Sequence, residues 1–295
     1  MMNTTTKTPS KGLATLSILT AASLWGVIGL WNRRLMAAGL SPTSIVAIRN
    51  FGCMLLMSLF FLVKDRSVFR VDRRHIKYFL GTGVISVVLF TVCLFTCQKL
   101  CSLAVSSVLL YTAPSFVVIL SAILWKEPVT KRKVVALVLT LVGCACVCGV
   151  FSGELTATAP GILLGLGAGL FYAMYNVFGR YALAHYSSMT VTVWTFLIAG
   201  PVSLLLLRPA ELLPAFSGTP GLWMIVLGLA LFSTTLPYFF YTWGLSGMEP
   251  GRASIISSVE VVVTAAAGAL VLGEPMTVLT AVGVLCVLAG ICILR

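Results

Sequence analysis

The hexapeptide WKEPVT at residues 125–130 returns in altered form as LGEPMT at residues 272–277. Each copy follows a long apolar stretch that opens with small residues, at 104–107 and at 253–258. Another apolar stretch follows each copy. Because the copies lie about half a chain apart, we interpret them as matching points of an internal repeat, which constrains the architecture of the whole chain.

The composition predicts a membrane protein. Apolar residues make up 59% of the chain and charged residues 9%, whereas soluble domains carry roughly 25% charged residues. Ten apolar stretches of about 17–24 residues can each cross a hydrocarbon core as a helix. Barrel strands would need alternating polarity, which these stretches lack. We therefore expect an all-α integral membrane protein with ten transmembrane helices. They fall at 13–32, 43–63, 77–98, 103–125, 134–151, 160–179, 190–207, 221–245, 253–272 and 278–294.

The positive charges predict the orientation. With the N-terminus inside, most basic residues fall in cytoplasmic segments, and four fall outside: Arg33, Arg34, Lys99 and Arg208. By the positive-inside rule, we therefore expect both termini in the cytoplasm. We expect the protein to be a multi-pass protein of the cell membrane. A nucleic-acid partner would require the bases on one folded face with stacking aromatics, so the net charge of +12 does not indicate one.

Ten crossings in two halves of five imply an inverted repeat, because an odd number of crossings makes the second half enter from the opposite side. We expect a polar, disordered segment at 1–12, a first repeat at 13–152 and a second at 153–295. Inverted repeats commonly support alternating access around a site near the midplane. The simpler alternative is that the duplication only stabilises a helix bundle.

Several short motifs recur in a fixed order along the chain: Leu24-Trp25-Gly26, residues 47–51, Tyr111-Thr112-Ala113-Pro114, the two Glu-Pro-x-Thr sequences, Gly143, Gly283 and Gly290. Together these motifs resemble a known family, the ten-helix transporters of the drug/metabolite transporter superfamily, whose repeat unit is the EamA domain. The resemblance implies a secondary carrier of small metabolites, often an exporter of amino acids or drugs. One departure is that Glu260 precedes Val261 where the family often has proline, which leaves a kink there open.

Glu260 is the most informative polar residue inside a predicted helix. An isolated acid at this depth costs about 2.5–3.5 kcal/mol on insertion scales, so its carboxyl group should face the interior or water. We expect it to bind substrate or to carry a coupling proton. The alternative is a structural acid bonded to a neighbouring hydroxyl or backbone group.

Arg49 and Pro114 are assigned structural or gating roles. Arg49 lies inside the predicted helix 43–63, where its guanidinium can hold backbone carbonyls near the outer end. The alternative is that Arg49 binds a substrate carboxylate in a bidentate fork. Pro114 can kink its helix and free carbonyl groups for a ligand.

Aromatic and amide side chains on the inner helices predict the walls of a binding cavity that can stack a planar or cationic substrate. Interfacial belts of tryptophan and tyrosine are the competing interpretation. We expect the cavity between the helices at 13–32, 77–98, 103–125, 160–179, 221–245 and 253–272. The wall residues that we single out are Trp25, Tyr111, Tyr172, Asn176 and Tyr238.

Other motifs predict structure rather than chemistry. Glu127 and Glu274 fall at opposite membrane faces, where we expect turns followed by the helix N-caps Thr130 and Thr277. The nine cysteines lie in apolar runs and are interpreted as buried thiols, not as a metal site. Gly26, Gly29, Gly165 and Gly169 are suited to close helix packing.

The sequence thus predicts a secondary transporter that exports amino acids or related small metabolites by alternating access. The main alternative is a proton-coupled exporter of cationic aromatic drugs. A membrane enzyme would need clustered acids or histidines at one face, which the sequence lacks, and a non-transporting membrane scaffold would bind no substrate. We expect no cofactor and no metal. We expect a monomer, since the fused halves already supply a two-fold arrangement.

Overall fold

A computed structural model describes residues 9–151 and 155–294, and every regular element in these ranges is helical. Residues 1–8 of the segment expected to be disordered lie outside the described residues, as do residues 152–154 around the expected boundary between the repeats. Lys11 and Gly12, in contrast, already belong to the first helix, because Ser10 caps its N-terminus with a side-chain hydrogen bond from Leu13 N.

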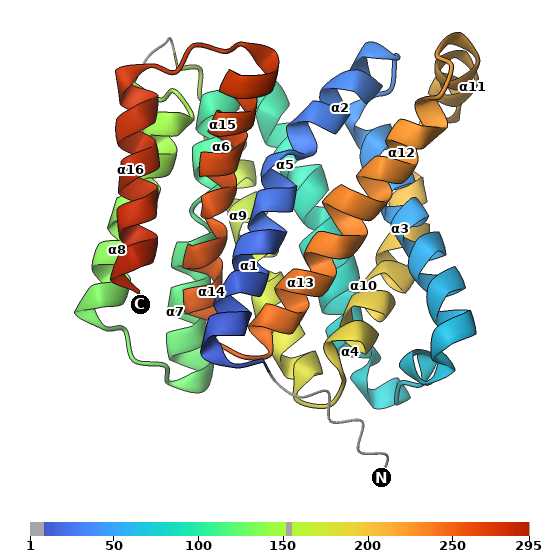
Figure 1. The fold of residues 1–295 in the computed structure, drawn as a ribbon, viewed down its shortest axis with the longest axis horizontal. Helices are drawn as coiled ribbons and strands as arrows, with labels where there is room; N and C mark the ends of the chain where they lie inside the picture. Colours follow the sequence, from blue (N-terminus) through green and yellow to red (C-terminus); the bar gives the residue numbers. More distant parts are fainter. Residues whose placement is uncertain (1–8, 152–154, 295) are drawn as a thin grey trace.

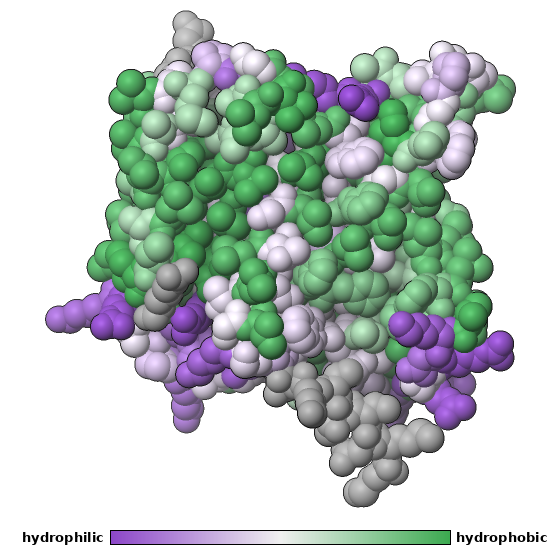
Figure 2. Space-filling view, viewed as in Figure 1, coloured by the Kyte–Doolittle hydropathy of each residue, from purple (hydrophilic) through white to green (hydrophobic). Residues whose placement is uncertain are grey.

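The helices form one bundle with an apolar belt between two polar ends (Figures 1 and 2). We call the end where the first helix begins the basic face, because arginine and lysine residues gather there, and the other end the far face. Elements of residues 9–151 are α1 (Lys11–Gly26), α2 (Ile28–Ala37), α3 (Pro42–Lys64), η1 (Arg66–Phe69), η2 (Arg73–His75), α4 (Ile76–Leu80), η3 (Gly81–Leu89), α5 (Phe90–Leu100), α6 (Leu103–Leu110), α7 (Ala113–Trp125) and α8 (Lys131–Val147).

The second half repeats this succession of long and interrupted helices. Its elements are α9 (Ala159–Leu183), α10 (Ser188–Ser203), η4 (Leu204–Leu206), α11 (Pro209–Gly218), α12 (Leu222–Ala230), η5 (Leu231–Thr235), α13 (Leu236–Leu245), α14 (Pro250–Ser257), α15 (Val259–Leu272) and α16 (Val278–Ile293).

In the part of the chain that the structure describes, eight helical segments are long and apolar enough to span a membrane. Most of them join two or three consecutive elements, such as α1 with α2 and α14 with α15. The segments at α8 and α16, with 17 and 16 residues, are shorter than the other eight. The prediction of an all-helical integral membrane protein is therefore confirmed by eight candidate spans.

The spans are interrupted near the middle of the bundle. The α6–α7 span breaks at Tyr111 and Thr112, and the α14–α15 span breaks at Ser258. Tyr111 and Ser258 are equivalent when the two Glu-Pro sequences are aligned. The second break forms although Val261 stands where the family often has proline. The helix is therefore interrupted at this point without a proline. The neighbouring Ser257 hydroxyl donates to the Ser254 carbonyl oxygen at 2.8 Å, a local bond that competes with regular helix geometry.

The turns around the two Glu-Pro sequences agree with their prediction. Thr130 accepts a hydrogen bond from Lys133 N, and Thr277 accepts one from Thr280 N, so both threonines are helix N-caps. The loop after α7 lies at the basic face and the loop after α15 at the far face (Figure 1).

Glycines allow α8 and α16 to approach within backbone contact. A Cβ atom added to Gly143 would lie 2.6 Å from the Gly283 carbonyl oxygen, and one added to Gly290 would lie 2.8 Å from the Ala136 carbonyl oxygen. These separations are shorter than real Cβ contacts, so only glycine fits. Gly26 and Gly169 make similar close approaches, whereas Gly29 faces open space and the packing expected for it is wrong.

We predict that Gly143→Ala lowers thermal stability, because its methyl group must push apart two helix backbones. Overpacking of this kind costs about 1–3 kcal/mol. The matched control is Gly29→Ala, since nothing lies within 4 Å of a Cβ at that position. Thermal unfolding in detergent measures both variants, and equal midpoints for Gly143→Ala and Gly29→Ala would contradict the close packing.

A carboxylate at the far face ties the surface helix α11 to the start of α3. Glu211 Oε2 accepts hydrogen bonds from Ser41 N, Ser41 Oγ and Ser44 Oγ at 2.7–2.8 Å. Desolvation raises the pKa of Glu211, but these bonds and the nearby Arg208 outweigh it, so the pKa lies below its ordinary value.

Because the folded-state pKa of Glu211 is lowered, its contribution to stability is present above about pH 4.3, the ordinary value for glutamate, and is lost as the pH falls through the folded-state pKa. We predict that Glu211→Gln flattens the dependence of the unfolding temperature on pH in that acidic range. Thermal unfolding between pH 7 and pH 3 provides the measurement. The control is Glu274→Gln, at an exposed glutamate. Parallel curves of unfolding temperature against pH for wild type and Glu211→Gln would contradict the stabilising role of the Glu211 hydrogen bonds.

Candidate functional site

A cavity of about 200 Å³ lies within the bundle. Its lining extends from the middle of the bundle toward the far face, since it includes Asn32 in the middle of α2 and Arg49 two turns after the start of α3. The interrupted spans contribute at their breaks: Tyr111 and Pro114 come from one break, and Ser258 and Glu260 from the other. Broken helices thus bring backbone and polar side chains to the cavity wall.

The structure brings together residues far apart in the chain. Of the residues singled out from the sequence, seven line the cavity: Trp25, Arg49, Tyr111, Pro114, Tyr172, Tyr238 and Glu260. Asn176 lies instead in a small adjoining void of about 10 Å³, which Trp25, Tyr172 and Tyr238 also line. The α3 wall was not among the helices expected to form the cavity.

Arg49 and Glu260 carry opposite charges into the same cavity without pairing. Among the described residues, no ion pair within 4.0 Å and no side-chain hydrogen bond joins either group to the protein, and Arg49 Nε is buried without a partner. Tyr238 lies close enough to interact electrostatically with both. A charged group left unpaired in an apolar surrounding is costly, which makes Arg49 and Glu260 the candidate ligand-binding groups of this cavity.

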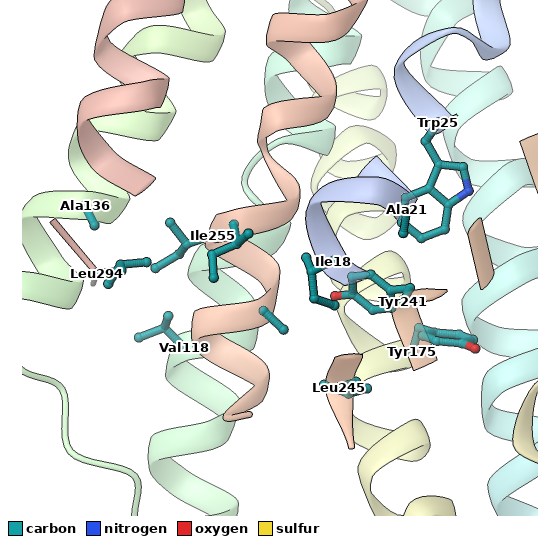
Figure 3. Packing of buried hydrophobic residues seen from close by; sticks show 12 residues of the cluster. Ile18, Ala21, Trp25, Val118, Ala136, Tyr175, Tyr241, Leu245, Ile255 and Leu294 are labelled. Carbon is teal, nitrogen blue, oxygen red and sulfur yellow. The ribbon is translucent and has the colours of Figure 1, made fainter. Parts of the chain in front are cut away.

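Aromatic rings close the cavity toward the basic face. Trp25 contacts Tyr238 edge-on at 5.2 Å between ring centroids and Tyr241 at 5.3 Å, and Tyr175 contacts Tyr238 at 5.3 Å. Figure 3 shows Trp25, Tyr241 and Tyr175 one beneath another, with Ile18 beside Tyr241 and Leu245 below Tyr175. This layer separates the cavity from the basic-face half of the bundle.

Hydrogen bonds hold this aromatic layer in place. Tyr241 Oη donates to Asn176 Oδ1 at 2.7 Å, and Tyr175 Oη lies 2.7 Å from Thr242 Oγ1. Both bonds join α9 to α13. In this structure Asn176 therefore orients a tyrosine below the cavity.

Other lining residues were not identified from the sequence as site residues. Ser254 and Ser257 contribute hydroxyl groups, and Phe90 and Phe95 contribute rings from α5. Asn32 has a buried Oδ1 without a hydrogen-bond partner. Its seven-residue spacing from Trp25 places both on one helix face, and this was the signal that could have identified it.

The cysteines do not assemble with other ligands. In residues 9–151 and 155–294, no group of three or more His, Cys, Asp or Glu side chains could hold a metal ion. Cys97 Sγ instead contacts Ser106 Oγ at 3.4 Å, and Cys101 is buried close to Gly161.

Comparisons with known proteins support the interpretation of this chain as a transporter. The profile of the EamA-like transporter family matches twice, over residues 12–149 and 159–295. An uncharacterized transporter of Archaeoglobus fulgidus is 29% identical over 279 residues, 94% of each chain. Another from the same organism is 29% identical over 252 residues, 85% of this chain and 88% of its own.

More distant relatives extend the match. YyaM of Bacillus subtilis, also named an uncharacterized transporter, is 25% identical and covers 85% of this chain and 83% of its own. A crystal structure with 18% identity superposes with a TM-score of 0.82 over 96% of both chains, which supports the fold. The names of these relatives point to a transporter rather than an enzyme. With the family profile covering nearly the whole sequence, the chain belongs to the EamA-like transporter family.

Proposed function

We propose that this protein is a secondary transporter that exports amino acids or related zwitterionic metabolites by alternating access. The observation that carries the proposal is the pair of opposite, unpaired charges, Arg49 and Glu260, on the wall of one cavity. An amino acid supplies a carboxylate for the first and an ammonium group for the second. Binding then satisfies charges that the empty cavity leaves without partners.

The size and lining of the cavity support a small substrate with an apolar part. Its volume of about 200 Å³ is below the roughly 300–1,000 Å³ that is usual for pockets of drug-sized ligands. Phe90, Phe95 and Tyr172 offer apolar and aromatic surface beside the charged groups. The competing function, export of cationic aromatic drugs, is favoured by Glu260 and the rings. Arg49 counts against it, because a cation in this cavity would be repelled.

The proposed architecture is ten crossings in two inverted halves of five, at 13–152 and 153–295. Under it, α8 and α16 are the last crossing of each half. The double match of the family profile supports this division, and so does the shared position of the breaks at Tyr111 and Ser258. The excess of lysine and arginine at the basic face supports a cell-membrane protein with both termini in the cytoplasm.

In the proposed cycle the halves rock around the cavity, which then opens to each side in turn. Glu260 alternates between binding the substrate ammonium group and binding a proton, so that proton entry drives export. Trp25, Tyr111 and Tyr238 contact the substrate, and the break before Pro114 provides the bend at which α7 moves. The transporter works as a monomer.

We predict that a neutral amino acid raises the thermal stability of the purified protein. The corresponding amine and the corresponding carboxylic acid should not, because each satisfies only one charge. Arg49→Gln should weaken binding about 10- to 100-fold, since a hydrogen bond to a charged group contributes about 1.5–3 kcal/mol. The assay is a thermal-shift titration, with Lys99→Gln, an exposed residue outside the cavity, as the matched control. A shift with an aromatic cation that Arg49→Gln leaves intact would favour the drug exporter instead.

We also predict that flux in proteoliposomes depends on an imposed pH gradient and that Glu260→Gln removes this dependence, because glutamine cannot bind and release a proton. Substrate counterflow, which needs no gradient, checks that the variant still cycles. Wild-type flux insensitive to pH and to Glu260→Gln would exclude the coupling role.

A further inference from the structure

The basic face is closed by a cluster of four charged residues, which we call the basic-face cluster: Glu127, Lys133, Arg180 and Glu249. Glu127 Oε1 is paired with Arg180 Nη1, and Lys133 Nζ lies 3.9 Å from Glu127 Oε2 and 2.6 Å from Glu249 Oε2. We propose that this cluster is an ionic gate that must separate before the cavity can open toward the basic face.

The four residues come from parts of the bundle that would have to move apart. Glu127 lies in the loop after α7, and Lys133 lies in the first turn of α8. Arg180 lies near the end of α9, and Glu249 lies immediately before α14. The cluster thus joins one half of the chain to the other, and its Arg180 lies one helical turn after Asn176, which accepts a hydrogen bond from Tyr241.

Burial makes the cluster strong while it is closed. The side chains of Glu127 and Lys133 are only 8% and 10% exposed, so their charges attract with little screening by water, whereas Arg180 and Glu249 at the edge of the cluster are 36% and 47% exposed. The guanidinium of Arg180 also stacks over the Trp125 ring, 4.4 Å from its centroid. Without Glu127, Arg180 would lose the anion with which it is paired, whereas Lys133 would keep Glu249.

Burial also makes the cluster easy to release once water enters. Glu127 Oε2 is buried and has no hydrogen-bond partner. A partly satisfied buried carboxylate gains hydration when its surroundings open, and this gain offsets part of the lost attraction. The cluster therefore favours either a dry closed arrangement or a wet open one over an intermediate between them.

The position equivalent to Glu127 at the far face carries a more exposed ion pair. Glu274, the repeat partner of Glu127, pairs with Arg33 at 2.9 Å, but the two side chains are 52% and 60% exposed. Exposed pairs of this kind contribute only about 0–1 kcal/mol. The ion pair at the far face is therefore weak, while at the basic face the central residues of the cluster, Glu127 and Lys133, are buried.

Hydrogen–deuterium exchange of the full-length protein in detergent, without substrate, tests the gate. Glu127→Gln should raise exchange about tenfold or more in the loop after α7 and in the residues before α14, and should slow it around the α15–α16 loop. The matched variant Glu274→Gln should leave exchange at the basic face unchanged. Arg180→Gln should behave as Glu127→Gln does, and Arg180→Lys should restore slow exchange because it keeps the charge.

Unchanged exchange at the basic face in Glu127→Gln and Arg180→Gln would overturn the gate. An equal rise at both faces would also overturn it, since that pattern indicates general loosening. The proposal rests on alternating access but not on the identity of the substrate. Failure of the proposed amino acid substrate would appear in the thermal-shift assay, whereas failure of the gate would appear only in the exchange pattern.

Discussion

The cost of leaving a charge unpaired in an apolar helix bundle shapes the rest of this protein. Only 9% of the residues are charged, and most lie at the two ends of the bundle. The few that lie deeper are placed in two ways. Four form the basic-face cluster, in which each charge has a partner of opposite sign. Arg49 and Glu260 line the cavity without one, and we propose that the substrate supplies their partners.

These two arrangements lie on the same path through the bundle. The cavity occupies the middle and the half toward the far face, the aromatic layer of Trp25, Tyr175 and Tyr241 lies beneath it, and the basic-face cluster lies at the end of the bundle beyond that layer. Under the proposed function, a substrate bound between Arg49 and Glu260 therefore lies directly above the aromatic layer.

Interrupted helices make this arrangement possible. Continuous helices would bury their backbone groups in regular hydrogen bonds and present only side chains to the cavity. The breaks at Tyr111 and Ser258, which are equivalent points of the two repeats, bring Pro114 and Glu260 to the cavity wall. Tight glycine contacts, such as that between Gly143 and Gly283, hold α8 and α16 together away from the cavity, so that movement at the breaks need not disturb that helix pair.

Many of the cavity residues could be predicted from the sequence, because polar side chains inside apolar spans are unfavourable in lipid and therefore tend to face the interior of the bundle. Trp25, Tyr111, Tyr172, Tyr238 and Glu260 follow that logic. Asn176 has the same sequence pattern, but its side chain is occupied by Tyr241, a contact that depends on how α9 and α13 pack. The α3 wall was missed because apolar residues such as Val46 give no sign of which face points inward.

The sequence by itself determined the helical membrane class, the turns and caps after the two Glu-Pro sequences, and most of the cavity residues. These features depend on local composition and spacing, and the cost of burying backbone and charge in lipid leaves few alternatives. Only the tertiary structure decided that Arg49 and Glu260 remain unpaired, and that Glu127 is a buried partner of Arg180 while Glu274 is exposed. The physical reason is that pairing depends on distances between helices that are far apart in the chain, and helix packing alone sets those distances.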